Sequence, residues 1–149
     1  MTSPESLDVR EVIFINERCR VDYEALPADV RESADQAIDA LQNARPLSSK
    51  MYRPLRGALS GIHEIRLPYD DNTYRVYVTL SCPWIIMVLD AGIKKSSDGK
   101  NIPKWQAERL DVRYKRARQY WTEHDAALKD DYDKRRVRRD TMTKEKGYE

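Results

Sequence analysis

The sequence is poor in the residue types that build disulfide, metal and membrane sites. Its 149 residues include only two cysteines and two histidines. Cys19 and Cys82 lie far apart and neither belongs to a Cys-x-x-Cys pair, so neither a disulfide framework nor a zinc site is predicted. His63 and His124 lack the paired spacing of metal ligands, so no metal and no other cofactor is expected. The longest apolar run, residues 84–89, is far shorter than the roughly 20 residues that a membrane span needs.

Several catalytic and targeting motifs are also missing. No Gly-x-Ser-x-Gly elbow surrounds any serine, which argues against a serine hydrolase of the usual kind. Neither of the standard glycine-rich nucleotide loops is present, so nucleotide binding through such a loop is not expected. Residues 1–5 lack the basic and apolar regions of a signal sequence. We therefore expect a reduced, cytoplasmic protein with no membrane partner.

Charged residues are abundant but unevenly distributed. They make up 35% of the chain, against 40% hydrophobic residues, and the net charge is only +2. A chain of this length predicts one domain with a modest core. Acidic residues gather between positions 22 and 40, whereas basic residues dominate the second half, so we expect a local basic face. The basic residues after position 50 include Arg53, Arg56, Lys94, Lys95, Lys100, Lys104 and the arginine-rich string 109–118.

Hydrophobic periodicity predicts an α+β fold built on a mainly antiparallel four-stranded sheet. Residues 9–15 form a β-branched segment of strand length, and residues 28–41 form an amphipathic helix. The pattern between them is weak and leaves a short helix open. Three strands then follow as a meander, with a hairpin turn at residues 70–72 and a last strand apolar enough to be covered on both faces. The three strands are predicted at residues 62–67, 74–80 and 84–89.

The remaining segments complete the predicted organisation of the chain. Residues 51–61, with two glycines and a proline, predict an ordered loop without a strand. A basic helix is expected to begin near Asn101 and Pro103. Beyond it the chain is mostly charge, which predicts a helical or disordered extension. We therefore predict an N-terminal tail at 1–8, a domain at 9–121 and a charged C-terminal extension at 122–149.

The first two meander strands carry a candidate site on their polar face. Because side chains alternate along a strand, His63 falls on the core face and Glu64 and Arg66 fall on the other. Pairing across the turn brings Arg75 near Arg66, with Tyr77 close by. Cations around a carboxylate and a phenol suit a polyanion, and Tyr77 is placed to stack a base. Two further cations follow the last strand at the same edge, Lys94 and Lys95.

A plainer interpretation stays open for each of these features. Arginine and lysine on the outer face of a sheet are often only solvated, and Glu64 with Arg75 would then be an ordinary cross-strand pair. His63 would be a structural core histidine. The aromatic side chains of the basic helix, at helical spacing, favour the core over base stacking; they are Trp105, Tyr114 and Trp121.

Several short strings, in this order and spacing, resemble the RelE/ParE toxin superfamily, and most closely its HigB-like branch, also described as phage Gp49-like. The resemblance spans roughly residues 11–120. A helix opened by Ile102-Pro103, with Ala107 and Arg113, fits the same pattern. The strings are Arg53-Pro54-Leu55-Arg56-Gly57, Gly61-Ile62-His63-Glu64-Ile65-Arg66, Tyr74-Arg75-Val76-Tyr77 and Gly92-Ile93-Lys94-Lys95-Ser96.

The resemblance implies a RelE-like domain, one twisted antiparallel sheet with helices packed on one side. It also implies the toxin of a type II toxin–antitoxin pair, which cleaves translated mRNA in the ribosomal A site without a metal. The implied partners are a helix-turn-helix antitoxin, the ribosome and mRNA; the oligomeric state is not implied. Two alternatives use the same fold without cleavage: a gyrase inhibitor of the ParE type, and a degenerate regulatory or phage-structural module.

The resemblance also assigns roles to particular residues. Arg66 and Arg75, with Lys94 or Lys95, match cations that stabilise the phosphate, and Glu64 or His63 becomes the proton acceptor. HigB-like proteins often carry a histidine just after the last strand, where this chain has Asp90-Ala91, so Asp90 is the candidate replacement. Arg66→Ala or Arg75→Ala is expected to abolish growth arrest while leaving the fold intact. The expected RNA contacts are Arg56, Tyr77, Lys100, Arg109 and Arg113.

Overall fold

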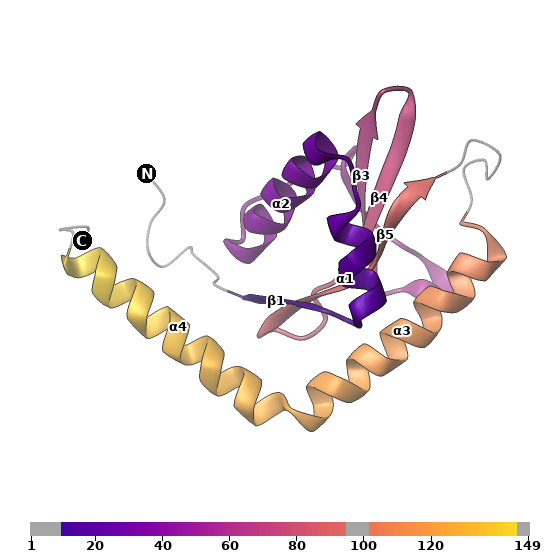
Figure 1. Cartoon of the computed structure of the whole chain (residues 1–149). Helices are drawn as coiled ribbons and strands as arrows, with labels where there is room; N and C mark the ends of the chain where they lie inside the picture. The colour runs from indigo at the N-terminus through magenta and orange to yellow at the C-terminus, as the bar shows by residue number, and fades with distance from the viewer. Residues whose placement is uncertain (1–9, 95–101, 146–149) are drawn as a thin grey trace.

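The computed structural model describes residues 10–94 and 102–145 (Figure 1). Within these residues five strands form one sheet in the order β1-β5-β4-β3-β2, with four α-helices and a short 3-10 helix around it. The strands are β1 (Glu11–Phe14), β2 (Tyr52–Pro54), β3 (His63–Tyr69), β4 (Asn72–Thr79) and β5 (Ile85–Lys94). The helices are α1 (Glu17–Glu24), α2 (Ala28–Gln42), η2 (Gly57–Leu59), α3 (Lys104–Glu123) and α4 (Asp125–Glu145).

The α+β class and the antiparallel meander β3-β4-β5 are confirmed, but the sheet is mixed and has one more strand than predicted. The extra strand, β2, lies in the segment expected to be a loop and pairs antiparallel with β3. At the other edge β1 runs parallel to β5, a pairing that the long connection through α1, α2 and three further strands permits. A three-residue strand is too short to show a period in sequence, which is why β2 was missed.

Helices α1 and α2 cover one face of the sheet. Asn16 begins α1 by accepting a hydrogen bond from the Cys19 amide at 2.8 Å, the usual role of an N-cap. Helix α2 confirms the predicted helix and buries its apolar stripe, which includes Val30, Ala34 and Ile38. Together these helices and the facing strand side chains form the first of two hydrophobic clusters.

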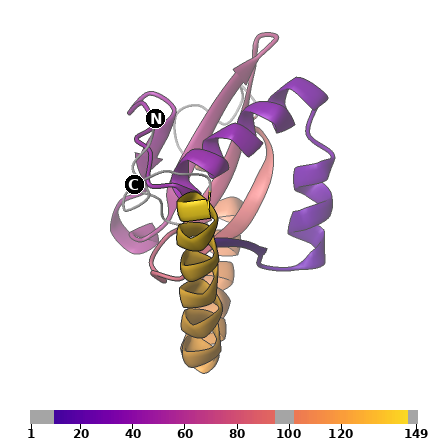
Figure 2. The ribbon, with the colours of Figure 1, turned by 90° about the vertical axis from the view of Figure 1, so that its left-hand side faces the viewer.

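Helix α3 covers the opposite face, so the expectation that helices pack on one side only is wrong (Figures 1 and 2). Leu110 and Ala117 of α3 are fully buried against the second cluster. The apolar run in β5 explains this arrangement. Its side chains alternate, with Ile86 and Val88 in the first cluster and Met87 and neighbours in the second, so both faces need a cover, as the run predicted.

The charged extension is helical from Asp125 to Glu145, one of the two predicted states. Helix α4 meets α3 in a V (Figure 1). Its first turns pack on the domain, because Leu128 and Tyr132 are buried and Trp84 donates to the Asp125 carboxylate at 3.0 Å. Among the described residues, no helix combines the length and apolarity that crossing a membrane requires.

Candidate functional site

A row of polar side chains crosses four strands on the face that α3 covers. The strand registers pair Arg53 with Glu64, Glu64 with Tyr77, and Tyr77 with Asp90. Residues paired in this way point to the same face of a sheet. The next row pairs Arg66 with Arg75. The register therefore confirms that the four polar residues predicted to share a face do so: Glu64, Arg66, Arg75 and Tyr77.

The centre of this face is a buried ion pair. Arg75 Nη1 donates to Glu64 Oε2 at 2.8 Å, and the two side chains are only 8% and 4% exposed. The expectation of a solvated outer face is thus wrong at this pair, because α3 and the loop around η2 cover it. A carboxylate buried this deeply needs a charged partner to offset the loss of hydration.

Tyr77 completes the buried centre as a neutral donor. Its hydroxyl donates to Glu64 Oε2 at 3.3 Å. Burial, followed by the nearby Glu64 carboxylate, raises the pKa of Tyr77 far above its ordinary value, so the phenol stays protonated. Because the side chain is 1% exposed, it cannot stack a base, and the expectation of Tyr77 as a direct RNA contact is wrong.

Two more guanidinium groups approach the free side of the same carboxylate. Arg53 Nη2 lies 3.6 Å and Arg66 Nε 4.0 Å from Glu64 Oε1, and both side chains are partly exposed. Three arginines therefore share one carboxylate. The Nε atoms of Arg66 and Arg75 are buried and have no hydrogen-bond partner within the described residues. A buried donor without a partner is unfavourable by about 1–3 kcal/mol, so an anion that these side chains turn to meet would gain contacts that the unbound protein lacks.

An open groove of about 850 Å³ lies over the ion pair. Glu64 and Arg75 line it together with Arg53 and with Arg56, the exposed residue that precedes η2. Its other side is formed by apolar groups before and within the first turn of α3. The further lining residues are Ser49, Tyr52, Pro54, Leu55, Leu59, Ile102 and Ala107. The groove is thus a cationic cleft with an apolar wall.

Gly61 sets how closely α3 approaches this face. Its φ is +102°, and a Cβ placed there would lie 2.6 Å from the Tyr114 hydroxyl of α3. A side chain at this position would therefore be strained at this φ and would also displace the Tyr114 side chain. Tyr114 in turn hydrogen-bonds Ser81 across 3.1 Å, which fixes α3 at the end of β4.

Asp90 anchors α3 and does not face the groove. The carboxylate is fully buried, and Arg109 donates to both of its oxygens, at 2.6 Å and 2.7 Å. Arg113 donates to Asp90 at 3.3 Å and to the Leu89 carbonyl at 2.7 Å. Enclosed by these partners, Asp90 is not placed to exchange a proton with a bound molecule, and the buried Arg113 is not placed to contact RNA.

Arg109 and Trp105 form a pair on the outer side of α3. The Arg109 guanidinium lies over the Trp105 ring at 5.2 Å from its centroid. Trp105 is among the most exposed large hydrophobic side chains of the described residues, so its expected place in the core is wrong. Its partners at helical spacing, Tyr114 and Trp121, are partly buried against the second cluster.

His63 lies on the other face of the sheet from Glu64. Its ring stacks on Tyr52, with centroids 4.6 Å apart, and packs toward the α1–α2 side. Burial lowers the pKa of His63 below its ordinary value. The predicted core-side position is therefore correct. His63 and Glu64 cannot both serve one site, and only Glu64 lines the groove.

Some residues of the expected site are not located, and one neighbour of Glu64 was missed. Lys95 and Lys100 lie outside the described residues, as does the side chain of Lys94, whose backbone ends β5 opposite Thr73. Arg53 was counted among the basic residues but not placed in the site, because its position depends on the unrecognised strand β2. The described residues contain no group of three or more histidine, cysteine, aspartate or glutamate side chains able to hold a metal ion.

Comparison with known proteins places most of the chain in one family. Residues 22–117 match the family model described as phage derived protein Gp49-like (DUF891). The matched segment contains the central ion pair, the Asp90 anchor and every residue that lines the groove. No curated protein and no solved structure matches the chain.

Proposed function

The chain belongs to the Gp49-like family of phage-derived proteins, a toxin–antitoxin-associated family of the RelE/HigB-like superfamily, and from this premise we propose that it is a ribosome-dependent mRNA endoribonuclease that needs no metal. One observation carries the proposal most directly. Arg66 and Arg75 hold buried, unpartnered Nε donors on a face where three arginines meet one carboxylate, and Arg75 lines an open groove.

The charge of the groove suits an RNA backbone. Glu64 offsets one of the three guanidinium groups, which leaves an excess of two positive charges near the groove floor. A phosphodiester carries one negative charge and offers several acceptor oxygens for arginine. Arg56, exposed at the rim, adds a contact for a neighbouring phosphate. Single-stranded RNA is the favoured form, because the apolar wall at Leu55 and Ile102 suits an unpaired base.

The proposed reaction uses the RNA as its own nucleophile. The 2′ oxygen attacks the adjacent phosphorus, and an O2′–P bond forms as the P–O5′ bond breaks. Glu64 accepts the proton of the 2′-hydroxyl, and water in the open groove supplies a proton to the departing 5′ oxygen. Arg66 and Arg75 stabilise the charge on the phosphorane; one such donor is typically worth about 2.7–4 kcal/mol. The products are a 2′,3′-cyclic phosphate and a 5′-hydroxyl end.

The partners follow from the same proposal. The ribosome would present mRNA to the groove, and an antitoxin, expected to carry a helix-turn-helix, would neutralise the toxin. Asp90, which holds α3 through Arg109 and Arg113, acts here as a positioning residue for the wall of the groove. We do not assign it a proton transfer.

Growth arrest on induction tests the proposal. Arg66→Ala removes a partly exposed cation that lies 4.0 Å from Glu64, one of the groove-lining residues, and should abolish growth arrest. Arg136→Ala removes an exposed arginine of α4 that does not line the groove, and should leave growth arrest unchanged. Far-ultraviolet circular dichroism of both purified variants checks that they remain folded. Wild-type toxicity in a folded Arg66→Ala variant would contradict the proposal.

One observation favours a second function without cleavage. Glu64 is almost completely buried beneath Arg75 and Tyr77, so a 2′-hydroxyl reaches it only if a neighbouring side chain moves. A protein of this fold that binds without cutting, such as a gyrase inhibitor, needs no such movement. A supercoiling assay with purified gyrase separates the two: inhibition at equimolar protein supports the second function, and unaffected supercoiling with a toxic protein contradicts it.

A further inference from the structure

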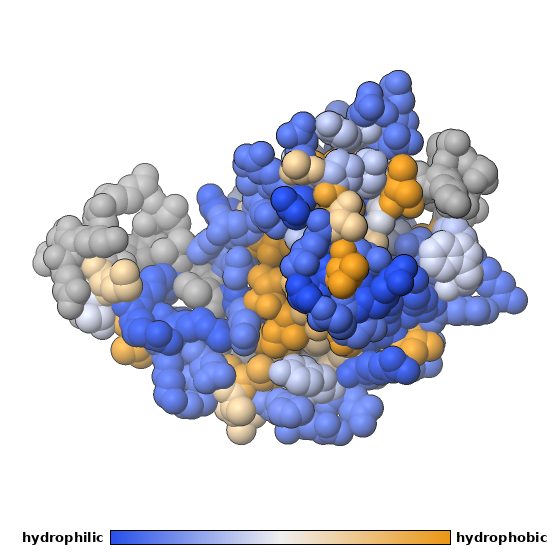
Figure 3. All heavy atoms as spheres, viewed as in Figure 1, coloured by the Kyte–Doolittle hydropathy of each residue, from blue (hydrophilic) through white to orange (hydrophobic). Residues whose placement is uncertain are grey.

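A second groove lies on the opposite face of the molecule from the arginine groove. It has a volume of about 780 Å³ and is bounded by α1, α2 and β1. Val12 and Phe14 of β1 and Ile38 of α2 supply its apolar surface. Apolar atoms gather in a hollow between the positions of α2 and β1 (Figure 3). Apolar surface left open beside an edge strand is typical of a binding surface.

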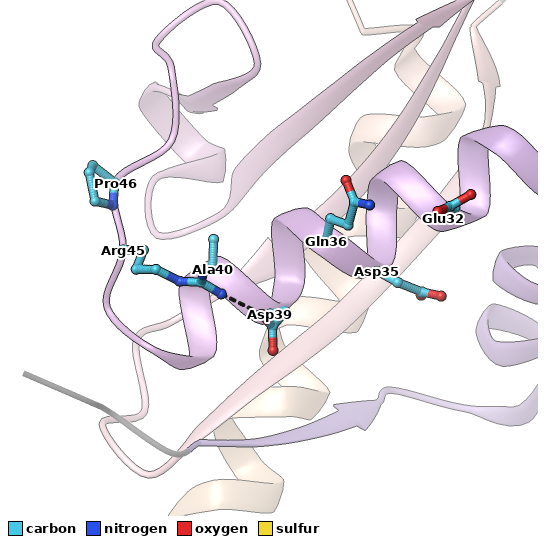
Figure 4. A pocket seen from close by; sticks show the side chains of 7 residues that line it. All are labelled: Glu32, Asp35, Gln36, Asp39, Ala40, Arg45 and Pro46. Atoms are coloured by element: carbon cyan, nitrogen blue, oxygen red, sulfur yellow. Dashed lines mark hydrogen bonds and ion pairs between the residues drawn. The ribbon is translucent and has the colours of Figure 1, made fainter. Parts of the chain in front are cut away.

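The walls of this groove are acidic. A smaller hollow of about 560 Å³ continues it along α2 and shares Asp35 and Asp39 with it (Figure 4). Asp39 forms an ion pair with Arg45, and Asp35 accepts a hydrogen bond from Tyr23 at 2.6 Å. The two hollows together are lined by four acidic and two basic side chains: Glu24, Glu32, Asp35 and Asp39, with Arg31 and Arg45. Glu24 also pairs with Arg20 at 2.8 Å, so with Arg20 counted the surplus is one negative charge, which disfavours nucleic acid and favours a cationic partner.

The outer edge of β1 adds backbone hydrogen-bonding groups to the groove. The Ile15 amide donates to the Val88 carbonyl in β5 at 3.0 Å. Because backbone groups alternate in direction along a strand, those of Val12 and Phe14 point away from β5, toward the open edge. The Arg10 carbonyl has the same outward direction and accepts from the Gln42 side chain at 2.7 Å. No hydrogen bond within the described residues reaches Val12 or Phe14 from outside the sheet, and such an edge can pair with an added strand.

We propose that this groove binds an extended, cationic segment of another protein, which adds as a strand to the outer edge of β1. Alternate apolar side chains of the segment lie on Val12, Phe14 and Ile38, and its lysine or arginine side chains meet the acidic wall. At roughly 3.3 Å per residue, β1 pairs with a segment of about four to six residues. The bound segment leaves the arginine groove on the opposite face open. This inference is independent of RNA cleavage.

A defined peptide tests the chemistry of the partner. The probe is a fluorescent nonapeptide of sequence Lys-Lys-Val-Ser-Val-Ser-Val-Lys-Lys, with one control in which glutamate replaces all four lysines and another in which proline replaces the central valine. Anisotropy should show binding of the probe and at least about tenfold weaker binding of both controls. The amide resonances of Val12 and Phe14 should shift. Equal binding of either control, or unshifted amides, overturns the proposal.

Matched variants test the location. Glu24→Lys with Asp39→Lys reverses the acidic wall and should weaken peptide binding about tenfold. Glu108→Lys with Glu123→Lys makes the same change in net charge on exposed positions of α3 and should leave binding unchanged. Equal effects of the two pairs contradict the proposed site. Sedimentation tests whether a second copy of the chain occupies the groove instead. A dimer that dissociates when the peptide is added would show that a second copy fills the edge, and would overturn the proposal.

Discussion

Removing one partner of the buried Glu64–Arg75 pair gives a large and specific prediction. Arg75→Met deletes the guanidinium but keeps an unbranched side chain of similar reach. Glu64, 4% exposed, would then retain the Tyr77 hydroxyl at 3.3 Å, the half-exposed Arg53 at 3.6 Å and the more distant Arg66 at 4.0 Å. Breaking a buried ion pair in this way typically costs about 3–5 kcal/mol. Because Arg53 can approach the carboxylate, we expect the lower end, about 3 kcal/mol.

A double variant separates the pair from the packing around it. Glu64→Gln together with Arg75→Met removes both charges and leaves no unpaired buried ion. Replacing both partners of a buried pair is often close to neutral, so the double variant should unfold with a free energy within about 1 kcal/mol of wild type. The difference between the single and double variants then measures the coupling of the two side chains.

Urea unfolding followed by tryptophan fluorescence is the assay. With a slope of about 1–3 kcal/mol per molar urea, a loss of 3 kcal/mol moves the midpoint by about 1–3 M. Arg75→Met within about 1 kcal/mol of wild type, or a double variant as unstable as the single one, would refute the reasoning. The burial of Arg75 also revises the expectation that Arg75→Ala leaves the fold intact, and makes Arg66 the cleaner probe of activity.

Three further predictions concern α3, Gly61 and His63. Asp90→Asn removes the charge that holds Arg113 and should lower the free energy of unfolding by about 3 kcal/mol, measured by urea unfolding. Gly61→Ala places a Cβ 2.6 Å from the Tyr114 hydroxyl at a positive φ and should cost about 1–3 kcal/mol, seen as a lower Tm. Burial lowers the pKa of His63. Below about pH 6.5 the unfolded chain therefore binds a proton that the folded chain resists, and the free energy of unfolding decreases as the pH is lowered. His63→Phe should flatten that fall between about pH 7 and about pH 5 in urea titrations.

Each of these predictions has a contradicting result. Asp90→Asn with wild-type stability would show that the buried carboxylate does not hold α3. Gly61→Ala that unfolds at the wild-type Tm would show that α3 adjusts freely to β3. A His63→Phe variant whose stability keeps the wild-type pH dependence would place the titrating group elsewhere.

Alternation along the strands predicted which side chains of the site share a face, but not their surroundings. Glu64 and Arg75 were correctly placed on the same face, because side chains alternate between the two faces along each strand. Whether that face is solvated depends on α3, whose buried Leu110 and Ala117 are far away in sequence. The same helix encloses Asp90, so a position expected to carry out chemistry became an anchor.

Strand β2 was missed, and β1 was predicted as a strand at residues 9–15 but without its parallel direction; both features have little local signal. Strands β1 and β2 have four and three residues, and neither the pairing of β2 nor the parallel direction of β1 can be deduced from such short segments. Arg53 was therefore not placed beside Glu64. In α4, the buried Leu128 and Tyr132 pack the extension against the domain. Their spacing of four residues is a helical pattern, although charged residues dominate the segment around them.

Mapping RNA ends after a brief induction tests the central claim most directly. The proposed reaction predicts new 5′-hydroxyl ends inside translated codons in cells expressing the wild-type chain, with matching 2′,3′-cyclic phosphate ends upstream. The same ends should be absent with folded Arg66→Ala and present with Arg136→Ala. Growth arrest by the wild-type chain without any new 5′-hydroxyl ends in translated mRNA would contradict the account.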